Sequence, residues 1–262
     1  MEQIDVEGLS IAFERSGDGP LVVLLHGILQ DGRAWRPQLE GLSEDFTIVA
    51  WDAPGCGRSS DPPEWFRMPD YADCLSAFIR ALHRGRPHLV GLSWGGALAL
   101  ELYRREPALP AALVLASAYA GWAGSLPADV VAERLEQGIR EADMPPARFV
   151  PGWIPGLLTD RASAEMIDEV VAFMSAFHPV GYRTMAHALA EADLREVLPT
   201  IEVPTLLLYG EEDRRSPLRV AEELHAKIPG SDLVVIPGVG HLSNVEAAAR
   251  FNAQLRNFLR AR

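Results

Sequence analysis

Short, continuous runs of apolar residues constrain the fold of this chain more than any other feature. They lie at Leu21–Leu25, Phe46–Trp51, Ala112–Leu115, Thr205–Gly210 and Asp232–Ile236. Because the apolar residues do not alternate with polar ones, each run is typical of a strand buried on both faces of a parallel sheet. Parallel neighbours are joined by helical crossovers, so these runs predict an α/β fold.

Helical patterns separate the apolar runs, as such a fold requires. Helices are predicted at Tyr71–His83, at Gly95–Arg105 and from about Val245 to Arg260. Two short strands are expected near the N-terminus, between Ile4 and Arg15. Strand and helix therefore alternate over most of the chain, which favours a sheet with helices on its faces.

The pattern changes between residues 120 and 190. This segment contains helical patterns, including a helix predicted over Arg161–Phe177, and no convincing strand. The prolines of Pro151–Pro155 indicate a turn between its helices. The simplest layout is one α/β core, residues 1–119 and 191–262, that carries residues 120–190 as a helical insertion over one end.

Composition disfavours several classes of partner. The chain has 262 residues and a formal net charge of −12, which argues against nucleic acid and anionic membranes. No apolar run approaches the roughly 18 residues of a membrane span, and the first residues lack the pattern of a signal peptide, so we expect a cytoplasmic protein. Cys56 and Cys74 are too few for a disulfide framework, although one bridge is compatible with the sequence. Nothing indicates the oligomeric state.

The segment Gly91–Gly96 is typical of a sharp turn between a strand and a helix. It follows the apolar run Pro87–Val90 and places Ser93 at the apex. Small residues are expected on both sides of such an apex because the turn leaves no room for side chains. In this context Ser93 is a candidate nucleophile, and a serine hydroxyl needs a general base to react at neutral pH.

Two loops that follow predicted strands supply a candidate base and a candidate acid. His241 follows the strand that ends at Ile236, and Asp213 follows the strand before it. Both loops are expected at the carboxyl edge of the sheet, where the sites of α/β proteins lie. A buried Asp213 would orient His241 and stabilise its protonated form. Glu211 and Glu212 are alternatives for the acid.

The loop after the first parallel strand completes the predicted site. The backbone N–H groups of Ile28 and Trp94 are candidates for an oxyanion hole, which stabilises negative charge on a carbonyl oxygen under attack. His26, in the same loop, is expected to be structural. We predict no cofactor, and the scattered histidines do not have the spacing of metal ligands.

Together these segments resemble the α/β-hydrolase family over nearly the full length of the chain. The resemblance rests on motifs in the family's order: Leu25-His26-Gly27, Asp52–Ser59, Gly91–Gly96, Gly210–Asp213 and Gly240-His241. It implies a mostly parallel, twisted sheet flanked by helices, with the insertion forming a lid after the sixth strand. It also implies a catalytic triad in the order serine, aspartate, histidine.

The predicted function is that of a serine hydrolase that cleaves a small-molecule carboxylic ester or lactone through an acyl-enzyme. Ser93 stands where epoxide hydrolases and haloalkane dehalogenases carry aspartate, which disfavours those reactions. Cofactor-free haloperoxidases and enol-lactonases share the triad, so they are not separated from esterases. Apolar side chains are candidates for the walls of a substrate pocket: Leu29, Trp122, Trp153, Phe173 and Leu242.

Two alternatives remain open at this point. Gly55–Ser59 and Ser93–Gly95 are similar to iminopeptidase sequences, and such an aminopeptidase needs an acidic pocket for the substrate amine. The insertion contains carboxylates that offer one: Glu133, Glu136, Glu141, Asp160, Glu165, Asp168 and Glu169. A non-catalytic, ligand-binding member of the family is disfavoured by the complete set of candidate catalytic residues.

Overall fold

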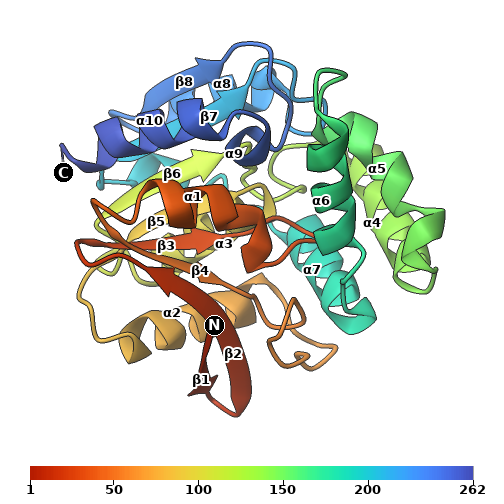
Figure 1. Ribbon diagram of the computed structural model, residues 1–262, viewed down its shortest axis with the longest axis horizontal. Helices are drawn as coiled ribbons and strands as arrows, with labels where there is room; N and C mark the ends of the chain where they lie inside the picture. Colours follow the sequence, from red (N-terminus) through yellow and green to blue (C-terminus); the bar gives the residue numbers. More distant parts are fainter. Residues whose placement is uncertain (262) are drawn as a thin grey trace.

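The chain folds around one eight-stranded sheet, as the computed structural model of the protein shows for residues 1–261 (Figure 1). The strand order is β1-β2-β4-β3-β5-β6-β7-β8. From β4 to β8 all neighbours are parallel, whereas β2 is antiparallel to both β1 and β4. The strands are β1 (Glu2–Val6), β2 (Leu9–Ser16), β3 (Leu21–Leu25), β4 (Thr47–Trp51), β5 (His88–Leu92), β6 (Ala112–Ala116), β7 (Thr205–Gly210) and β8 (Asp232–Ile236).

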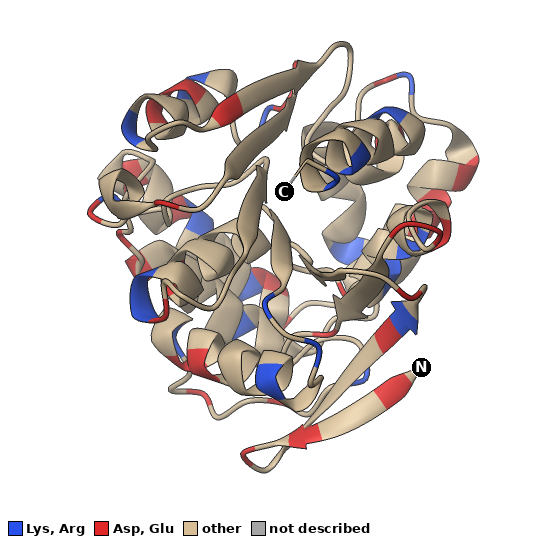
Figure 2. Ribbon diagram, turned by 90° about the vertical axis from the view of Figure 1, so that its left-hand side faces the viewer, with Lys and Arg blue, Asp and Glu red and all other residues tan. Residues whose placement is uncertain are grey.

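The continuous apolar runs are the strands of the parallel part of the sheet, as predicted. Every residue of β3, β4, β5, β6 and β7 is buried. Strand β8 lies at the edge of the sheet and is only partly buried. Figure 2 shows the same division, because the inner strands carry almost no charge and the charged residues lie on the helices and outer strands.

Helices cover both faces of the sheet. On one face, α1 (Arg36–Gly41) packs against α10 (Ala248–Leu259); on the other, α2 (Met68–Ala81) packs against α3 (Trp94–Arg105) (Figure 1). Helix α8 (Leu218–Lys227) contacts β7 and β8. These layers are those of an α/β fold, which confirms the predicted fold class.

The helix predicted from Val245 to Arg260 is divided in two. A short helix, α9 (Ser243–Glu246), precedes α10, and Ala247 separates them with a φ of −134° and a ψ of 45°, outside the helical range. The helical periodicity of the sequence continues across Ala247, so the sequence does not reveal the break. A short 3₁₀ helix, η1 (Gly32–Trp35), precedes α1 and was not predicted.

The insertion between β6 and β7 contains four α-helices, which group together beside the sheet (Figure 1). They are α4 (Ala128–Ala142), α5 (Val150–Leu157), α6 (Ala164–Met174) and α7 (Pro179–Glu191), with 3₁₀ helices η2 (Pro146–Arg148) before α5 and η3 (Leu198–Thr200) after α7. The role of these helices as a lid, and the boundaries 120–190, stay predictions.

The turn predicted over Pro151–Pro155 is wrong, because this segment is helix α5. Pro151 lies in the first turn, where a backbone N–H has no intrahelical acceptor to lose, while Pro155 lies inside the helix and removes one bond. Burial of Val150, Trp153 and Leu157 offsets that loss. Helix α6 is shorter than its predicted span and begins after Ser163, whose side chain caps it by accepting from an N–H of the first turn.

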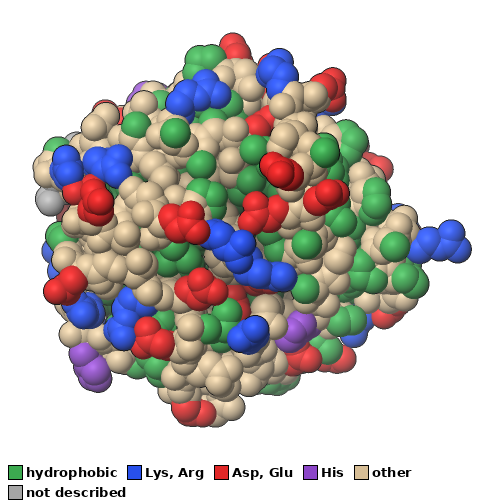
Figure 3. Space-filling view, in the orientation of Figure 1, with side chains coloured by type: hydrophobic (Ala, Val, Ile, Leu, Met, Phe, Trp, Pro, Cys, Tyr) green, Lys and Arg blue, Asp and Glu red, His purple; other side chains and the backbone are tan. Residues whose placement is uncertain are grey.

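The face of the molecule shown in Figure 3 carries charges of both signs without a large patch of either. Within residues 1–261, no helix is both long enough and apolar enough to cross a membrane. Cys56 and Cys74 are both buried and free, so the single bridge compatible with the sequence does not form.

Candidate active site

Ser93 lies at the sharp turn between β5 and α3. Its φ of 53° and ψ of −110° are backbone angles that residues with side chains rarely adopt. A Cβ at Gly91 would lie 2.3 Å from the carbonyl oxygen of Gly95, and a Cβ at Gly95 would lie 2.2 Å from that of Leu25. The turn therefore closes only with glycine on both sides, and it presents Ser93 at the carboxyl edge of the sheet.

His241 and Asp213 form a buried pair on the loops that follow β8 and β7. Nδ1 of His241 lies 3.0 and 2.9 Å from Oδ1 and Oδ2 of Asp213. Oδ1 also accepts the backbone N–H groups of Arg215 and Ser216, at 2.9 and 2.8 Å. These bonds fix the carboxylate, which in turn orients the imidazole so that Nδ1–H donates and Nε2 is left as an acceptor.

The two alternative acids lie elsewhere. Glu211 and Glu212 are both exposed. Glu211 accepts the backbone N–H of Gly238 at 2.8 Å, and Glu212 pairs with the guanidinium of Arg161. Of the three candidates, Asp213 is therefore the one that contacts His241.

The two backbone N–H groups predicted as oxyanion donors belong to Trp94, next to Ser93, and to Ile28, in the loop after β3. Trp94 is the first residue of α3, where a backbone N–H has no intrahelical acceptor. In the described part of the chain, neither this N–H nor that of Ile28 has a hydrogen-bond acceptor. The indole of Trp94 is buried and packs edge-to-face against Tyr71, with ring centroids 4.9 Å apart. Trp94 thus contributes its backbone to the turn and its side chain to the core.

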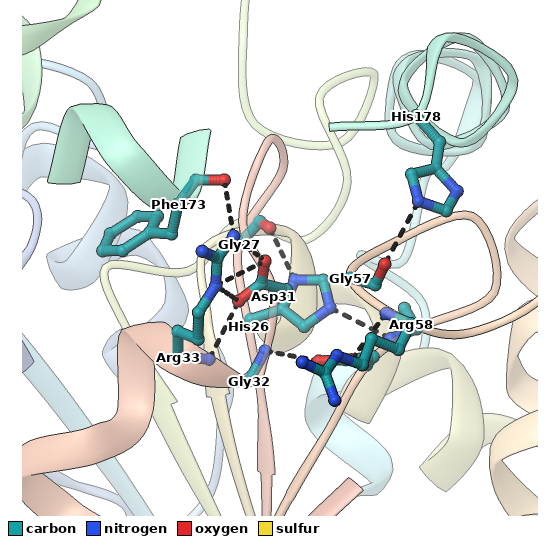
Figure 4. A network of polar contacts seen from close by, with 11 residues as sticks. His26, Gly27, Asp31, Gly32, Arg33, Gly57, Arg58, Phe173 and His178 are labelled. Atoms are coloured by element: carbon teal, nitrogen blue, oxygen red, sulfur yellow. Dashed lines mark hydrogen bonds and ion pairs between the residues drawn. The ribbon is translucent and has the colours of Figure 1, made fainter. Parts of the chain in front are cut away.

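His26 holds the loop that contains Ile28 (Figure 4). Its Nδ1 lies 2.8 Å from the carbonyl oxygen of Gly27, and the N–H of Ala53 donates to its Nε2 at 3.0 Å. Burial lowers the pKa of His26, so the ring is neutral, with one nitrogen donating and the other accepting. This arrangement is structural, as the sequence indicated.

Asp52 fastens the same loop to the neighbouring one. Its Oδ1 accepts the N–H of Gly32 at 2.8 Å and its Oδ2 accepts that of Arg58 at 2.9 Å. Burial raises the pKa of Asp52 to about 6, and the two N–H donors oppose that shift. The carboxyl group bridges two loops and does not contact the candidate triad.

Ser93 and His241 line one narrow cavity at the carboxyl edge of the sheet. Side chains or backbone of the following residues line it: Gly27, Ile28, Gln30, Ser93, Tyr119, Trp122, Arg134, Trp153, Leu157, Arg215 and His241. Of the five predicted wall residues, Trp122 and Trp153 line this cavity. Leu29, Phe173 and Leu242 are buried outside it, and the carbonyl of Phe173 accepts a bond from Arg33 (Figure 4).

Sequence reasoning missed several residues of the cavity, above all two arginines. Arg215 carried a signal, because it lies two positions after Asp213 in a loop already assigned to the site. The sequence contains no signal for Arg134, because this residue lies on α4 among other charged residues. Only the packing of that helix directs its side chain into the cavity. Across residues 1–261, no group of three or more His, Cys, Asp or Glu side chains is arranged to hold a metal ion.

The insertion is fastened to the loop that carries His241. The carboxylate of Glu246 accepts the N–H of Gly240 at 2.7 Å and the N–H of Thr159 at 2.9 Å. The N–H of Leu242 donates to the carbonyl oxygen of Leu157 at 3.0 Å. Leu242 is therefore bonded directly to the last residue of α5, and Gly240 is linked through Glu246 to Thr159, just after that helix.

The layers, the turn at Ser93 and the loops around it are those of an enzyme with an α/β-hydrolase fold. The sequence profile described as "Alpha/beta hydrolase family" matches residues 22–254, and the chain belongs to this family.

Proteins similar to this chain include esterases and, among solved structures, an enol-lactonase. A pimeloyl-(acyl-carrier protein) methyl ester esterase of Aliivibrio salmonicida is 26% identical over 256 residues, which cover 95% of this chain and 96% of that protein. The structure of a thermophilic esterase from Thermogutta terrifontis, with malate bound, matches with a TM-score of 0.93 and 29% identity over 100% of this chain and 99% of that one. An enol-lactonase from Burkholderia xenovorans LB400 matches with a TM-score of 0.90 over 98% and 99% of the two chains, and at 23% identity it shows the fold alone.

Proposed function

We propose that this protein is a serine hydrolase that cleaves a small carboxylic ester or lactone through an acyl-enzyme intermediate. One observation carries the proposal: Ser93, on its strained turn, lines the same cavity as His241. Nδ1 of His241 is held by the buried Asp213, which leaves Nε2 to act as the base. The names of the esterase relatives support ester substrates.

The proposed reaction follows from these positions. Ser93 Oγ attacks the carbonyl carbon while His241 Nε2 accepts its proton, and Asp213 stabilises the resulting imidazolium. The N–H groups of Ile28 and Trp94 stabilise the oxyanion, each contributing about 10²–10³ in rate. His241 then protonates the departing alkoxide. Water, deprotonated by the same nitrogen, attacks the acyl-enzyme and releases the acid.

The aminopeptidase alternative has less support. Six of the seven carboxylates that suggested an acidic pocket are exposed, and the seventh, Glu141, is buried but does not line the cavity. Arg134 and Arg215 line it instead. Two guanidinium groups repel a substrate ammonium, so we propose no amine-binding function for this site.

Labelling with a fluorophosphonate tests the nucleophile directly. We expect the wild type to be labelled and Ser93→Ala to be unlabelled, with hydrolysis of short-chain p-nitrophenyl esters reduced at least about 10⁴-fold. Ser117→Ala is a matched control, because Ser117 is also buried, has a φ of 45° and follows the neighbouring strand β6. Equal labelling of wild type and Ser93→Ala would refute the assignment.

A further inference from the structure

Two arginine side chains line the cavity beside Ser93 without a carboxylate partner. Arg134 comes from α4, and Arg215 comes from the loop between β7 and α8. Among residues 1–261, neither guanidinium has an acidic oxygen within 4.0 Å, whereas surface arginines such as Arg105 are paired. An unpaired cation in a confined pocket is unfavourable unless an anion joins it.

Arg215 is held by stacking on an aromatic ring. Its Cζ lies 3.8 Å from the centroid of the Trp153 ring. Burial lowers the pKa of Arg215, and the charge of Arg134 acts in the same direction, yet a guanidinium stays protonated in proteins. Stacking occupies the face of the guanidinium, while its N–H groups lie in its plane. In the described part of the chain, those N–H groups have no acceptor.

Arg134 is also fixed in position. Its Nη1 donates to the hydroxyl of Tyr119 and its Nη2 to the carbonyl oxygen of Arg215, both at 3.1 Å. Its Cζ lies 5.6 Å from the centroid of the Trp122 ring. The backbone of one arginine therefore positions the side chain of the other, and both are ordered before any ligand arrives, which reduces the entropy lost on binding.

The nearby carboxylates are already engaged. Asp213 accepts bonds from His241 and from two backbone N–H groups. Glu141 accepts from Gln137 at one oxygen, and at the other from the indole N–H of Trp153 and the hydroxyl of Tyr182. Neither lines the cavity, so the positive charge inside it is left for a ligand.

We propose that Arg215 and Arg134 form an anion-binding subsite, and that the substrate is an ester or lactone that carries a carboxylate. The inference rests on the proposed hydrolysis at Ser93. A planar carboxylate fits the in-plane N–H groups of a stacked guanidinium and accepts two parallel bonds from it. The cavity beside Ser93 is narrow, with room for about one water molecule. A compact acid of a few carbon atoms therefore suits it better than a long acyl chain.

The test compares two esters of the same size. Monomethyl glutarate carries the carboxylate, and methyl 5-amino-5-oxopentanoate carries a neutral amide in its place. We expect wild type to favour the anionic ester by about 10- to 100-fold in kcat/KM, the range of a charge-assisted hydrogen bond. In Arg215→Gln this ratio should fall toward one, and in Arg215→Lys, which keeps the charge, part of it should return.

Arg214→Gln is the matched control, because it removes the adjacent charge, which is exposed and does not line the cavity. It should leave the kcat/KM of both esters unchanged. A ratio near one in wild type, or a ratio that survives both Arg215→Gln and Arg134→Gln, overturns the subsite.

A binding measurement separates this inference from the proposed function. Ser93→Ala should bind glutarate at least about tenfold more tightly than it binds glutaramide, and the double variant with Arg215→Gln should lose this preference. Glutarate binding without turnover of any ester would refute the hydrolase and keep the subsite. Turnover of both esters at equal rates, with equal binding of glutarate and glutaramide, would refute the subsite and keep the hydrolase.

Discussion

Replacing Gly95 with alanine tests whether contact between two backbones closes the turn at Ser93. The added Cβ would lie 2.2 Å from the carbonyl oxygen of Leu25, 2.6 Å from its carbon and 2.8 Å from the carbonyl oxygen of His26. Leu25 is the last residue of β3, and this strand is hydrogen-bonded to β4 on one side and β5 on the other. The strand cannot move away without loss of those ladders.

The size of the effect follows from the distance that must be regained. Ordinary contact begins at 3.4 Å, so α3 and the end of β3 must separate by about 1.2 Å. Overpacking a core costs about 1–3 kcal/mol and occasionally more, and a clash between backbones lies at the upper end. Alanine gains up to about 1 kcal/mol over glycine in a helix. We expect a net loss of at least about 2 kcal/mol, or roughly 4–8 °C in Tm for a chain of this size.

Urea unfolding of Gly95→Ala measures this loss, and Gly152→Ala is its control. Gly152 also lies in a helix, α5, but a Cβ there would meet no atom within 4 Å. The control should be neutral or gain up to about 1 kcal/mol. If Gly95→Ala is as stable as the wild type, or if both variants lose equally, the explanation of the turn fails.

Two further predictions concern the loops around the cavity. For Asp52, burial makes the folded state bind a proton more tightly than the unfolded state, so wild type loses stability as the pH rises from about 4 to about 6. As the pH rises over that range, the unfolding free energy of Asp52→Asn should increase relative to that of wild type by up to about 3 kcal/mol. A difference between the two proteins that does not change with pH would contradict the burial effect. Glu246→Gln replaces one of two accepting oxygens with a donor, so urea unfolding should show a loss of about 1–3 kcal/mol. A neutral exchange would mean that this contact does not fasten the insertion.

The parts of the fold that could be predicted depend on local patterns. The buried strands are continuous apolar runs, and the turn at Ser93 requires glycine at fixed positions on either side, so both leave a direct trace in the sequence. The sequence of helix α5, in contrast, is misleading. Pro151 and Pro155 argue against a helix locally, and burial of Trp153 and its neighbours in the assembled protein overrides that preference.

The electrostatic character of the site depends on placement, which composition does not give. The chain carries a net charge of −12, and carboxylates of the insertion suggested an acidic pocket. Six of those seven carboxylates face solvent, where Glu136 and Glu169 pair with surface arginines and water and salt screen them. Arg134 shares α4 with Glu136, yet it faces the cavity, where a charge is screened far less. An acidic protein can therefore present a cationic pocket, and the selectivity ratio between the two methyl esters measures that local field.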